Sequence, residues 1–238
     1  MTDKKRTLSI IVPAYNEEKT LAKVVCDVSA IAGQLLDDYE VVIVNDASTD
    51  KTGGIADMLA RENPHVRAHH NPRNMNLGFN FKKGIELASK NYICLIPADD
   101  DITYESLEAI IGGTGKADLV LAYHASYEMR HPLRRWVSKL FVVIMNLLFG
   151  FKLKYYNGPV VIEAHALRGV TITTFGFASM AEIVVTLLKC GYSYIEVPMK
   201  LNPDRKGVNL RVFRPRNVAS VLKTITMLFW NVRIIRKY

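Results

Sequence analysis

The sequence predicts an α/β protein with a mostly parallel sheet flanked by helices. In the first half of the 238-residue chain, short apolar runs alternate with segments of helical periodicity, which is the order of βαβ units. The runs are continuous in apolar residues, as expected of strands that are buried on both faces. The hydrophobic content of 49% is sufficient for the core of one domain, or of one domain with a helical appendage.

The expected elements follow one another as strand, loop and helix. Residues 8–12 are an apolar run that Pro13 ends, and Asn16 is placed to cap the helix that follows. Residues 40–44 are the second strand, and a polar loop follows at 45–50. The other elements of the first half are a helix around 55–59, a strand at 66–69, a helix from about 80 to 88, a strand at 92–95, a helix from about 102 and a strand at 118–122.

Polar segments follow three of these strands, at 13–18, 45–50 and 97–101. In a parallel sheet they all leave from the same edge. Ligands of open α/β sheets bind beyond the carboxyl ends of the strands. We therefore expect a ligand site where the three loops converge.

The most informative loop carries three consecutive acids, Asp99-Asp100-Asp101, directly after the apolar run 92–95. Like charges repel one another, so a cation that carries a phosphate would offset the cost of grouping them. Mg²⁺ and Mn²⁺ usually take one or two carboxylates, with water and substrate phosphate at the other positions. Asp99 and Asp101 are two residues apart, so on an extended backbone they point the same way. The alternative is a polar loop that caps the next helix.

The second half of the chain contains two apolar segments with basic neighbours, Trp136 to Phe151 and Val218 to Ile235. The first is too short to span a bilayer, which takes about 20 apolar residues. Basic flanks, an aromatic boundary and an apolar face are typical of a helix that lies in the membrane interface. An amphipathic helix packed on the sheet is the alternative for either segment. Two such segments, each next to arginines, favour contact with a membrane.

The net charge of +8 is unevenly spread, since no acid follows Asp204. A second basic cluster lies at Arg130, Arg134, Arg135 and Lys139. This asymmetry suggests an anionic partner, which is nucleic acid, a phosphorylated substrate or an anionic lipid surface. Long aliphatic runs, and not base-stacking aromatic residues, lie between the basic residues, so we expect no nucleic-acid partner.

The three cysteines are Cys26, Cys94 and Cys190, each in apolar sequence and far from the others. This usage predicts reduced cysteines and argues against a disulfide framework or a zinc site. The first residues run directly into a strand without the apolar core of a signal peptide. We therefore expect a cytoplasmic protein that is peripheral on the membrane.

Three motifs, at 11–18 (IVPAYNEE), 44–50 (VNDASTD) and 97–101 (PADDD), resemble in order and spacing the signatures of the family 2 glycosyltransferases, which have the GT-A fold. The rest of the chain more narrowly resembles the dolichol- and polyprenyl-phosphate sugar synthases, such as dolichol-phosphate mannose synthase. The matching pieces of this second resemblance are 134–139, 157–159, 176–182, 191–198 and 205–207.

The resemblance implies a domain organisation. A GT-A domain would cover 1–210, with a nucleotide-sugar-binding half at 1–122 and an acceptor half at 123–210 that includes an interface helix at about 133–150. A basic amphipathic helix would follow at 211–238.

The resemblance also implies which residues bind the donor, a UDP- or GDP-sugar. The loop that contains Pro13, Ala14, Tyr15 and Glu17 would line the nucleotide pocket, and Asp46 would contact the base or the ribose.

Asp99 and Asp101 would hold the donor diphosphate through a Mg²⁺ or Mn²⁺ ion. The synthases commonly have an Asp where this chain has Pro97, so metal binding here depends on Asp99 and Asp101. They also often have an arginine soon after the 118–122 strand, where this chain has Tyr123-His124.

On the acceptor side, the resemblance implies that Arg134 and Ser138 lie where a lipid phosphate arrives, and that a loop with Arg205 and Lys206 closes over the substrates. Arg130 is a further cation available to the phosphate. Arginine forks suit phosphate oxygens because they donate two hydrogen bonds at once.

The leading hypothesis is a metal-dependent inverting glycosyltransferase that moves a sugar to a polyprenyl (dolichyl or undecaprenyl) phosphate at the cytoplasmic membrane face. The acceptor phosphate is already ionised at neutral pH, because its second pKa is about 6, so no general base is needed. The alternative acceptor is a hydroxyl of a lipid-linked or cell-surface glycan, and Glu182 would then be the base. A membrane-protein partner and a homo-oligomer both stay open.

Overall fold

The computed structural model describes the chain except for residues 1–4, 126–131, 174–178, 204–214 and 231–238, and it leaves out the side chains of 132–134 and 215–220. The described residues form one seven-stranded sheet with the strand order β3-β2-β1-β4-β6-β5-β7. The strands are β1 (Thr7–Ala14), β2 (Asp38–Asn45), β3 (Val66–His70), β4 (Tyr92–Leu95), β5 (Leu119–His124), β6 (Val160–Glu163) and β7 (Tyr194–Met199).

The sheet is mostly parallel, as the sequence predicts. β1 lies between β2 and β4 and pairs with both in parallel, and β2 pairs with β3 in the same way. β6 is antiparallel to its two neighbours, β4 and β5, and β5 is parallel to β7. The carboxyl ends of β1, β2, β4 and β5 therefore lie at one edge of the sheet.

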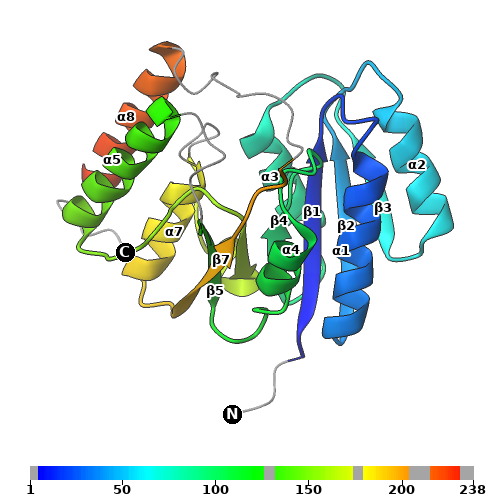
Figure 1. Cartoon of the computed structure of the whole chain (residues 1–238), viewed down its shortest axis with the longest axis horizontal. Coiled ribbons are helices and arrows are strands. Elements are labelled where there is room, and N and C mark those ends of the chain that lie inside the picture. Colours follow the sequence, from blue (N-terminus) through cyan, green and yellow to red (C-terminus); the bar gives the residue numbers. More distant parts are fainter. Residues whose placement is uncertain (1–4, 126–131, 174–178, 204–214, 231–238) are drawn as a thin grey trace.

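Helices cover both faces of the sheet (Figure 1). One face packs against α1 (Leu21–Leu35), α2 (Thr52–Glu62) and α4 (Tyr104–Ile111). The other face packs against α3 (Leu77–Leu87), α5 (Pro132–Phe149), α6 (Ala164–Arg168), α7 (Ser179–Lys189) and α8 (Pro215–Phe229). The central strands are buried on both sides, which explains why their sequences are continuous apolar runs.

The expected cap of the first helix is wrong. Helix α1 begins at Leu21 with Thr20 at the N-cap position, and no side chain caps it. Asn16 instead lies in the left-handed region, with a φ of +58°. Asparagine tolerates this conformation better than most residues do, and its amide contacts the neighbouring loop, as described below.

The two apolar segments of the second half are helices α5 and α8, which lie side by side at one end of the molecule (Figure 1). Parts of both helices reach the core, since Met145, Phe149 and Leu228 are buried. Among the described residues, no helix is long and apolar enough to cross a bilayer.

Candidate active site

The three polar loops converge at the carboxyl ends of β2, β1 and β4. The backbone N–H of Asp46 donates to the carbonyl oxygen of Ala14 over 2.9 Å, and that of Ala98 donates to the carbonyl oxygen of Pro13 over 3.3 Å. The loop after β1 is therefore joined to the loops on both sides of it. Pro13 and Ala14 are buried and contribute these carbonyl oxygens to the join.

Side chains tie the loop after β1 to the loop after β2. The N–H of Asn16 donates to Ser48 Oγ over 3.0 Å, and the N–H of Thr49 donates to Asn16 Oδ1 over 2.8 Å. The N–H of Glu17 donates to Thr52 Oγ1 over 2.8 Å. The left-handed conformation of Asn16 allows both of these contacts. Asn16 therefore holds the two loops together and does not cap α1.

Tyr15 and Glu17 belong to the loop after β1 and differ in burial. The Tyr15 side chain is 45% exposed and is available to a ligand. Burial raises the pKa of the Glu17 carboxyl; a hydrogen bond from Thr20 opposes the rise, and the negative charges of Asp101 and Asp50 add to it. Glu17 is thus within electrostatic reach of the acid loop.

Asp46 is buried, with 2% of its surface exposed. Its carboxylate accepts hydrogen bonds from Asn71 Nδ2 at 2.9 Å, from the N–H of Met75 at 2.8 Å and from the N–H of Asn76 at 3.0 Å. These bonds fix the segment between β3 and α3. The geometry favours a positioning role for Asp46 over the direct contact with base or ribose that the resemblance implies.

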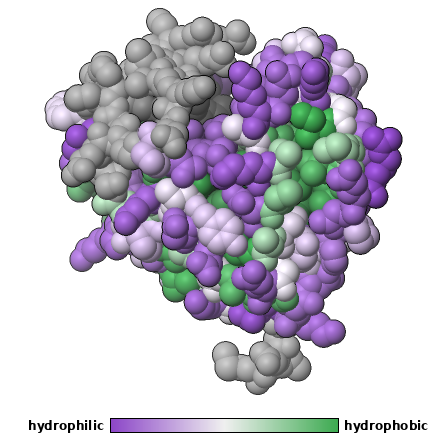
Figure 2. Space-filling model, turned by 45° about the vertical axis from the view of Figure 1, so that its right-hand side comes forward, coloured by the Kyte–Doolittle hydropathy of each residue, from purple (hydrophilic) through white to green (hydrophobic). Residues whose placement is uncertain are grey.

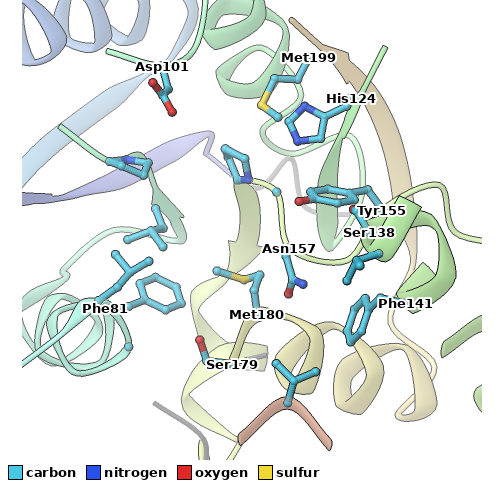
Figure 3. A pocket seen from close by; sticks show the side chains of 18 of the residues that line it. Phe81, Asp101, His124, Ser138, Phe141, Tyr155, Asn157, Ser179, Met180 and Met199 are labelled. Carbon is cyan, nitrogen blue, oxygen red and sulfur yellow. The ribbon is translucent and has the colours of Figure 1, made fainter. Parts of the chain in front are cut away.

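In the acid loop, Asp99 and Asp101 line the same cavity, and Asp100 is not among its lining residues. Asp100 turns to α1 instead, where Lys23 Nζ lies 2.8 Å from its Oδ1. Figure 3 shows the Asp101 carboxylate at one side of the cavity. Asp99 and Asp101 thus face one cavity while Asp100 does not, but the backbone at Asp100 is left-handed (φ +52°) and not extended as the prediction assumed.

The cavity has a volume of about 500 Å³ and is mainly apolar away from the acids. Its walls come from separate parts of the sequence between Leu77 and Ile225, and they include Phe81 of α3, Phe141 of α5, Met180 of α7, Met199 of β7 and Ile225 of α8 (Figure 3). The residues of the donor loops, Pro13 to Glu17 and Asp46, are not among the lining residues. The acids thus stand between the joined loops on one side and an apolar cavity on the other.

A few polar side chains face this cavity, and the sequence did not single them out as a group. Ser138, His124, Asn157 and Ser179 all line it. His124, at the end of β5, is 3% exposed and packs edge-on against Tyr155 with ring centroids 4.8 Å apart. These residues come from four separate places in the chain, so only the fold brings them together.

Gly158 fixes the approach of Asn157 to the sheet. A Cβ atom at Gly158 would lie 2.3 Å from the carbonyl oxygen of Ala122 in β5. Any other residue at this position would therefore clash with the backbone. The glycine therefore lets the segment before β6 lie directly on β5.

The carboxylate oxygens at the acid loop are suitable ligands for a hard divalent cation. Within the described part of the chain, no group of three or more His, Cys, Asp or Glu side chains is placed to hold a metal ion. Two carboxylates on one cavity wall are nevertheless sufficient for Mg²⁺ or Mn²⁺ when water and a diphosphate complete the coordination. Asp99 and Asp101 are the residues that would hold the ion.

Glu182, the expected base of the alternative reaction, has a different environment. It lies in the first turn of α7, is 3% exposed and is not among the residues that line the cavity. Its Oε1 accepts hydrogen bonds from the N–H of Thr173, over 3.1 Å, and from the hydroxyl of the same residue. This geometry favours a structural role and disfavours the role of a base.

The expected acceptor residues are only partly described. Ser138 of α5 lines the cavity. Arg134 lies in the first turn of α5, but its side chain is outside the described part of the structure, as are Arg130, Arg205 and Lys206 as whole residues. Their roles stay predictions.

Comparison with known proteins identifies the family. Residues 9–173 match the model of glycosyl transferase family 2, so the chain belongs to this family of enzymes. A dolichyl-phosphate beta-glucosyltransferase of Trichomonas vaginalis is 31% identical over 145 residues, which is 55% of this chain and 45% of that protein. An undecaprenyl-phosphate 4-deoxy-4-formamido-L-arabinose transferase of Pseudomonas fluorescens is 26% identical over 151 residues, which is 63% of this chain and 44% of that protein. The chain spans less than half the length of these relatives.

Solved structures share the fold. Glucosyl-3-phosphoglycerate synthase from Mycobacterium tuberculosis, in complex with Mn²⁺, UDP-glucose and phosphoglyceric acid, superposes with a TM-score of 0.68 over 93% of this chain and 80% of that one, at 15% sequence identity. The same enzyme in complex with Mg²⁺ and UDP gives a TM-score of 0.69 at 16% identity, over 94% of this chain and 79% of that one. The chain therefore has the GT-A glycosyltransferase fold.

Proposed function

We propose that this glycosyltransferase is a metal-dependent inverting enzyme that transfers a sugar from a UDP- or GDP-sugar to a polyprenyl phosphate at the cytoplasmic face of a membrane. The observation that carries the proposal is the cavity in which Asp99 and Asp101 stand at one side and the apolar side chains of α5 and α8 form another. The acidic wall suits a diphosphate that a cation carries, and the apolar wall suits an isoprenoid chain. The relatives that act on dolichyl or undecaprenyl phosphate support the choice of acceptor.

On the donor side, the joined loops after β1 and β2 form the surface on which the nucleotide would lie, with Tyr15 exposed for stacking. Asp99 and Asp101 would hold the diphosphate at the cavity through the cation. A bound divalent cation supplies Lewis-acid neutralisation of the leaving diphosphate. The solved GT-A enzyme that binds Mn²⁺ or Mg²⁺ with UDP supports this use of a metal.

On the acceptor side, the apolar cavity would take the first isoprene units and exclude water from the reacting atoms. An ionised phosphate needs no base, so the task of the chain is to hold its oxygen behind the anomeric carbon. Alignment of this kind lowers a barrier by on the order of 7–11 kcal/mol at best. Ser138 and His124 face the cavity and can donate to the phosphate, and Arg134 lies in the first turn of the helix that contains Ser138.

The location of Glu182 outside the cavity lining supports the phosphate over the hydroxyl acceptor. Two substitutions separate these acceptors. We expect modest loss of transfer in Glu182→Gln and severe loss in Arg134→Ala. Near-total loss in Glu182→Gln, with Arg134→Ala active, would favour a hydroxyl acceptor.

The exposed apolar side chains of α5 and α8 support peripheral attachment to the membrane. Trp136, Leu140, Val143 and Leu147 recur at helical spacing on α5 and are 36% or more exposed, as are Leu222 and Trp230 at the other helix. The face of the molecule in Figure 2, by contrast, is mostly hydrophilic, with hydrophobic residues in small groups. An apolar face of this size next to basic residues is typical of a helix in the membrane interface.

The test is a transfer assay over a panel of UDP- and GDP-sugars, with and without undecaprenyl or dolichyl phosphate. We expect transfer of label to the lipid fraction with only one or two donors, and loss of transfer in EDTA. Turnover that persists in EDTA, or that does not need the lipid phosphate, would contradict the proposal.

A further inference from the structure

Asp100 has an unusual backbone conformation at the centre of the acid loop. Its φ is +52°, in the left-handed region that few residues other than glycine adopt. This conformation turns Asp100 away from the cavity that its two neighbours line. A residue in this region persists only where surrounding contacts hold it, so the contacts of Asp100 determine how the neighbouring acids are presented.

One holding contact comes from helix α1. Lys23 Nζ lies 2.8 Å from Asp100 Oδ1 and 2.9 Å from Asp27 Oδ2. The hydrogen bond to Asp100 raises the pKa of Lys23, with a smaller opposing effect of burial. The ammonium group therefore neutralises the one acid of the triplet that does not face the cavity.

The second holding contact is Asn202, which follows β7. Its Nδ2 lies 2.6 Å from the carbonyl oxygen of Asp100, 3.2 Å from Asp100 Oδ1 and 3.3 Å from the carbonyl oxygen of Ile102. Its backbone N–H donates to the carbonyl oxygen of Asp101 over 3.0 Å. An amide group has only two hydrogens, so the short bond to the Asp100 carbonyl is the principal one. Asn202 thereby serves three successive carbonyl groups of the loop.

Neighbouring backbone contacts keep Asn202 in place. Ile102 and Leu201 form an antiparallel bridge, and the N–H of Thr103 donates to the carbonyl oxygen of Lys200 over 3.2 Å. The N–H of Lys200 in turn donates to Ser106 Oγ over 2.8 Å. The residues directly after β7 are therefore bonded to the residues that follow the acids.

We infer that Asn202 and Lys23 are positioning residues for the donor site: by holding Asp100 in its left-handed conformation, they turn Asp99 and Asp101 together toward the metal–diphosphate. This inference rests on the proposed function. It assigns Asp100 to the support of the site, and it makes the chain segment after β7 a part of the metal-binding geometry.

The test measures Mn²⁺ binding by electron paramagnetic resonance, with UDP and separately with GDP present. The variants are Asn202→Ala, Asn202→Asp and Lys23→Gln. Loss of the Asn202 amide should weaken Mn²⁺ binding about tenfold, because two hydrogen bonds to the loop are lost. Asn202→Asp should bind more weakly still, since a carboxylate cannot donate and repels Asp100. Lys23→Gln should weaken binding about threefold.

Asn91→Ala is the matched control. Asn91 Nδ2 donates to a backbone carbonyl, that of Lys5, over 3.1 Å, but it does so at the opposite edge of the sheet. We expect its Mn²⁺ affinity to equal that of the wild type. If the role of Asn202 is merely structural, Asn202→Ala and Asn202→Asp should both have a lower melting temperature and an unchanged Mn²⁺ affinity. This result would overturn the inference.

Two further outcomes are decisive. If the Asn202 variants do not fold, Lys23→Gln carries the test, because the Lys23 side chain is 55% exposed and its loss leaves the core intact. Unchanged affinity in that variant would then overturn the inference. If the wild type does not bind Mn²⁺ in the presence of UDP or in the presence of GDP, the proposed function fails, and the inference fails with it. If the wild type binds Mn²⁺ and the variants bind it with the same affinity, the inference is contradicted, and the proposed function is not.

Discussion

Three adjacent acids have different environments in this protein. Asp99 and Asp101 line the cavity, and Asp100 is held by Lys23 and Asn202. The sequence predicts the alternation from the spacing of the acids, but it contains no sign of the two residues that hold it. Asn202 is 102 positions away from Asp100, and the pairing of β5 with β7, together with the bridge between Ile102 and Leu201, brings the two together.

Substitution of single acids separates their roles. We expect Asp99→Asn and Asp101→Asn each to lower sugar transfer by at least about 100-fold, because the cation that neutralises the leaving diphosphate loses a ligand. Asp100→Asn is the comparison, because asparagine can accept the hydrogen bonds of Lys23 and Asn202 and tolerates a positive φ; it loses only the ion pair with Lys23, so we expect a loss of about threefold. Transfer rates at saturating donor measure the effect. Equal losses in all three variants would contradict the division of roles.

The buried position of Glu17 predicts a pH-dependent stability difference. Burial raises the pKa of the Glu17 carboxyl above its ordinary value in the folded protein, so the folded state disfavours the charged form, and stability from this group is lost as the pH rises through the folded pKa. Glu17→Gln should therefore melt higher than the wild type at pH 7, by about 1–2 °C because solvent screens a half-buried group. The difference should vanish below about pH 4.5. Melting curves without metal or nucleotide measure it, and a difference independent of pH would count against this reading.

At the scale of elements, the first half of the sheet follows directly from the sequence. The apolar runs at 8–12, 40–44, 92–95 and 118–122 are in the strands β1, β2, β4 and β5, which are mostly buried, and the strand expected at 66–69 is β3, which is partly exposed. Strands β6 and β7 and helix α6 were not predicted. β6 has only four residues and pairs with strands far from it in sequence, so its structure depends on tertiary contacts that a local pattern does not contain.

A substitution at Gly158 tests how strongly the stability of β6 and of the cavity depends on close packing against β5. Gly158→Ala should lower the free energy of unfolding by about 1–3 kcal/mol, because overpacking against backbone cannot relax. Gly54→Ala in α2 is the control, since nothing lies within 4 Å of its added Cβ, and it should stabilise by about 0.4–1 kcal/mol. Denaturant titration measures both. A neutral Gly158→Ala would show that the segment before β6 is free to move.

The exposed faces of α5 and α8 predict partition onto vesicles. Trp136 and Leu147 are 68% and 75% exposed, and burial of such side chains contributes about 1.5–3 kcal/mol each. Trp136→Ser and Leu147→Ser should each lower binding to anionic vesicles about tenfold.

Met58→Ser, on the exposed side of α2, is the control for these variants. Flotation with anionic vesicles, repeated in 0.5 M salt, separates the apolar part of the affinity from the electrostatic part, since salt screens only the latter. Equal flotation of all variants would mean that the face of α5 does not enter the membrane.

For the whole molecule, the sequence predicted the order of the elements up to β5, because it follows from the βαβ pattern, and ligand binding at the carboxyl edge of the sheet stays a prediction. It did not predict the cavity. The walls of the cavity come from α3, α5, α7 and α8, whose apolar faces are also consistent with plain core packing. The burial and the hydrogen bonds of Asp46 and Glu182 also depend on the fold and could not be read from their spacing, and the roles that the resemblance implies for these two residues stay predictions.

The most direct test of the central claim is the position of the metal in crystals grown with Mn²⁺ and UDP or GDP. We expect an anomalous peak at the manganese absorption edge between the nucleotide diphosphate and the carboxylates of Asp99 and Asp101. A nucleotide bound without a peak at these two carboxylates, or a peak elsewhere in the molecule, would contradict the claim that the acid loop holds the donor at the mouth of the apolar cavity.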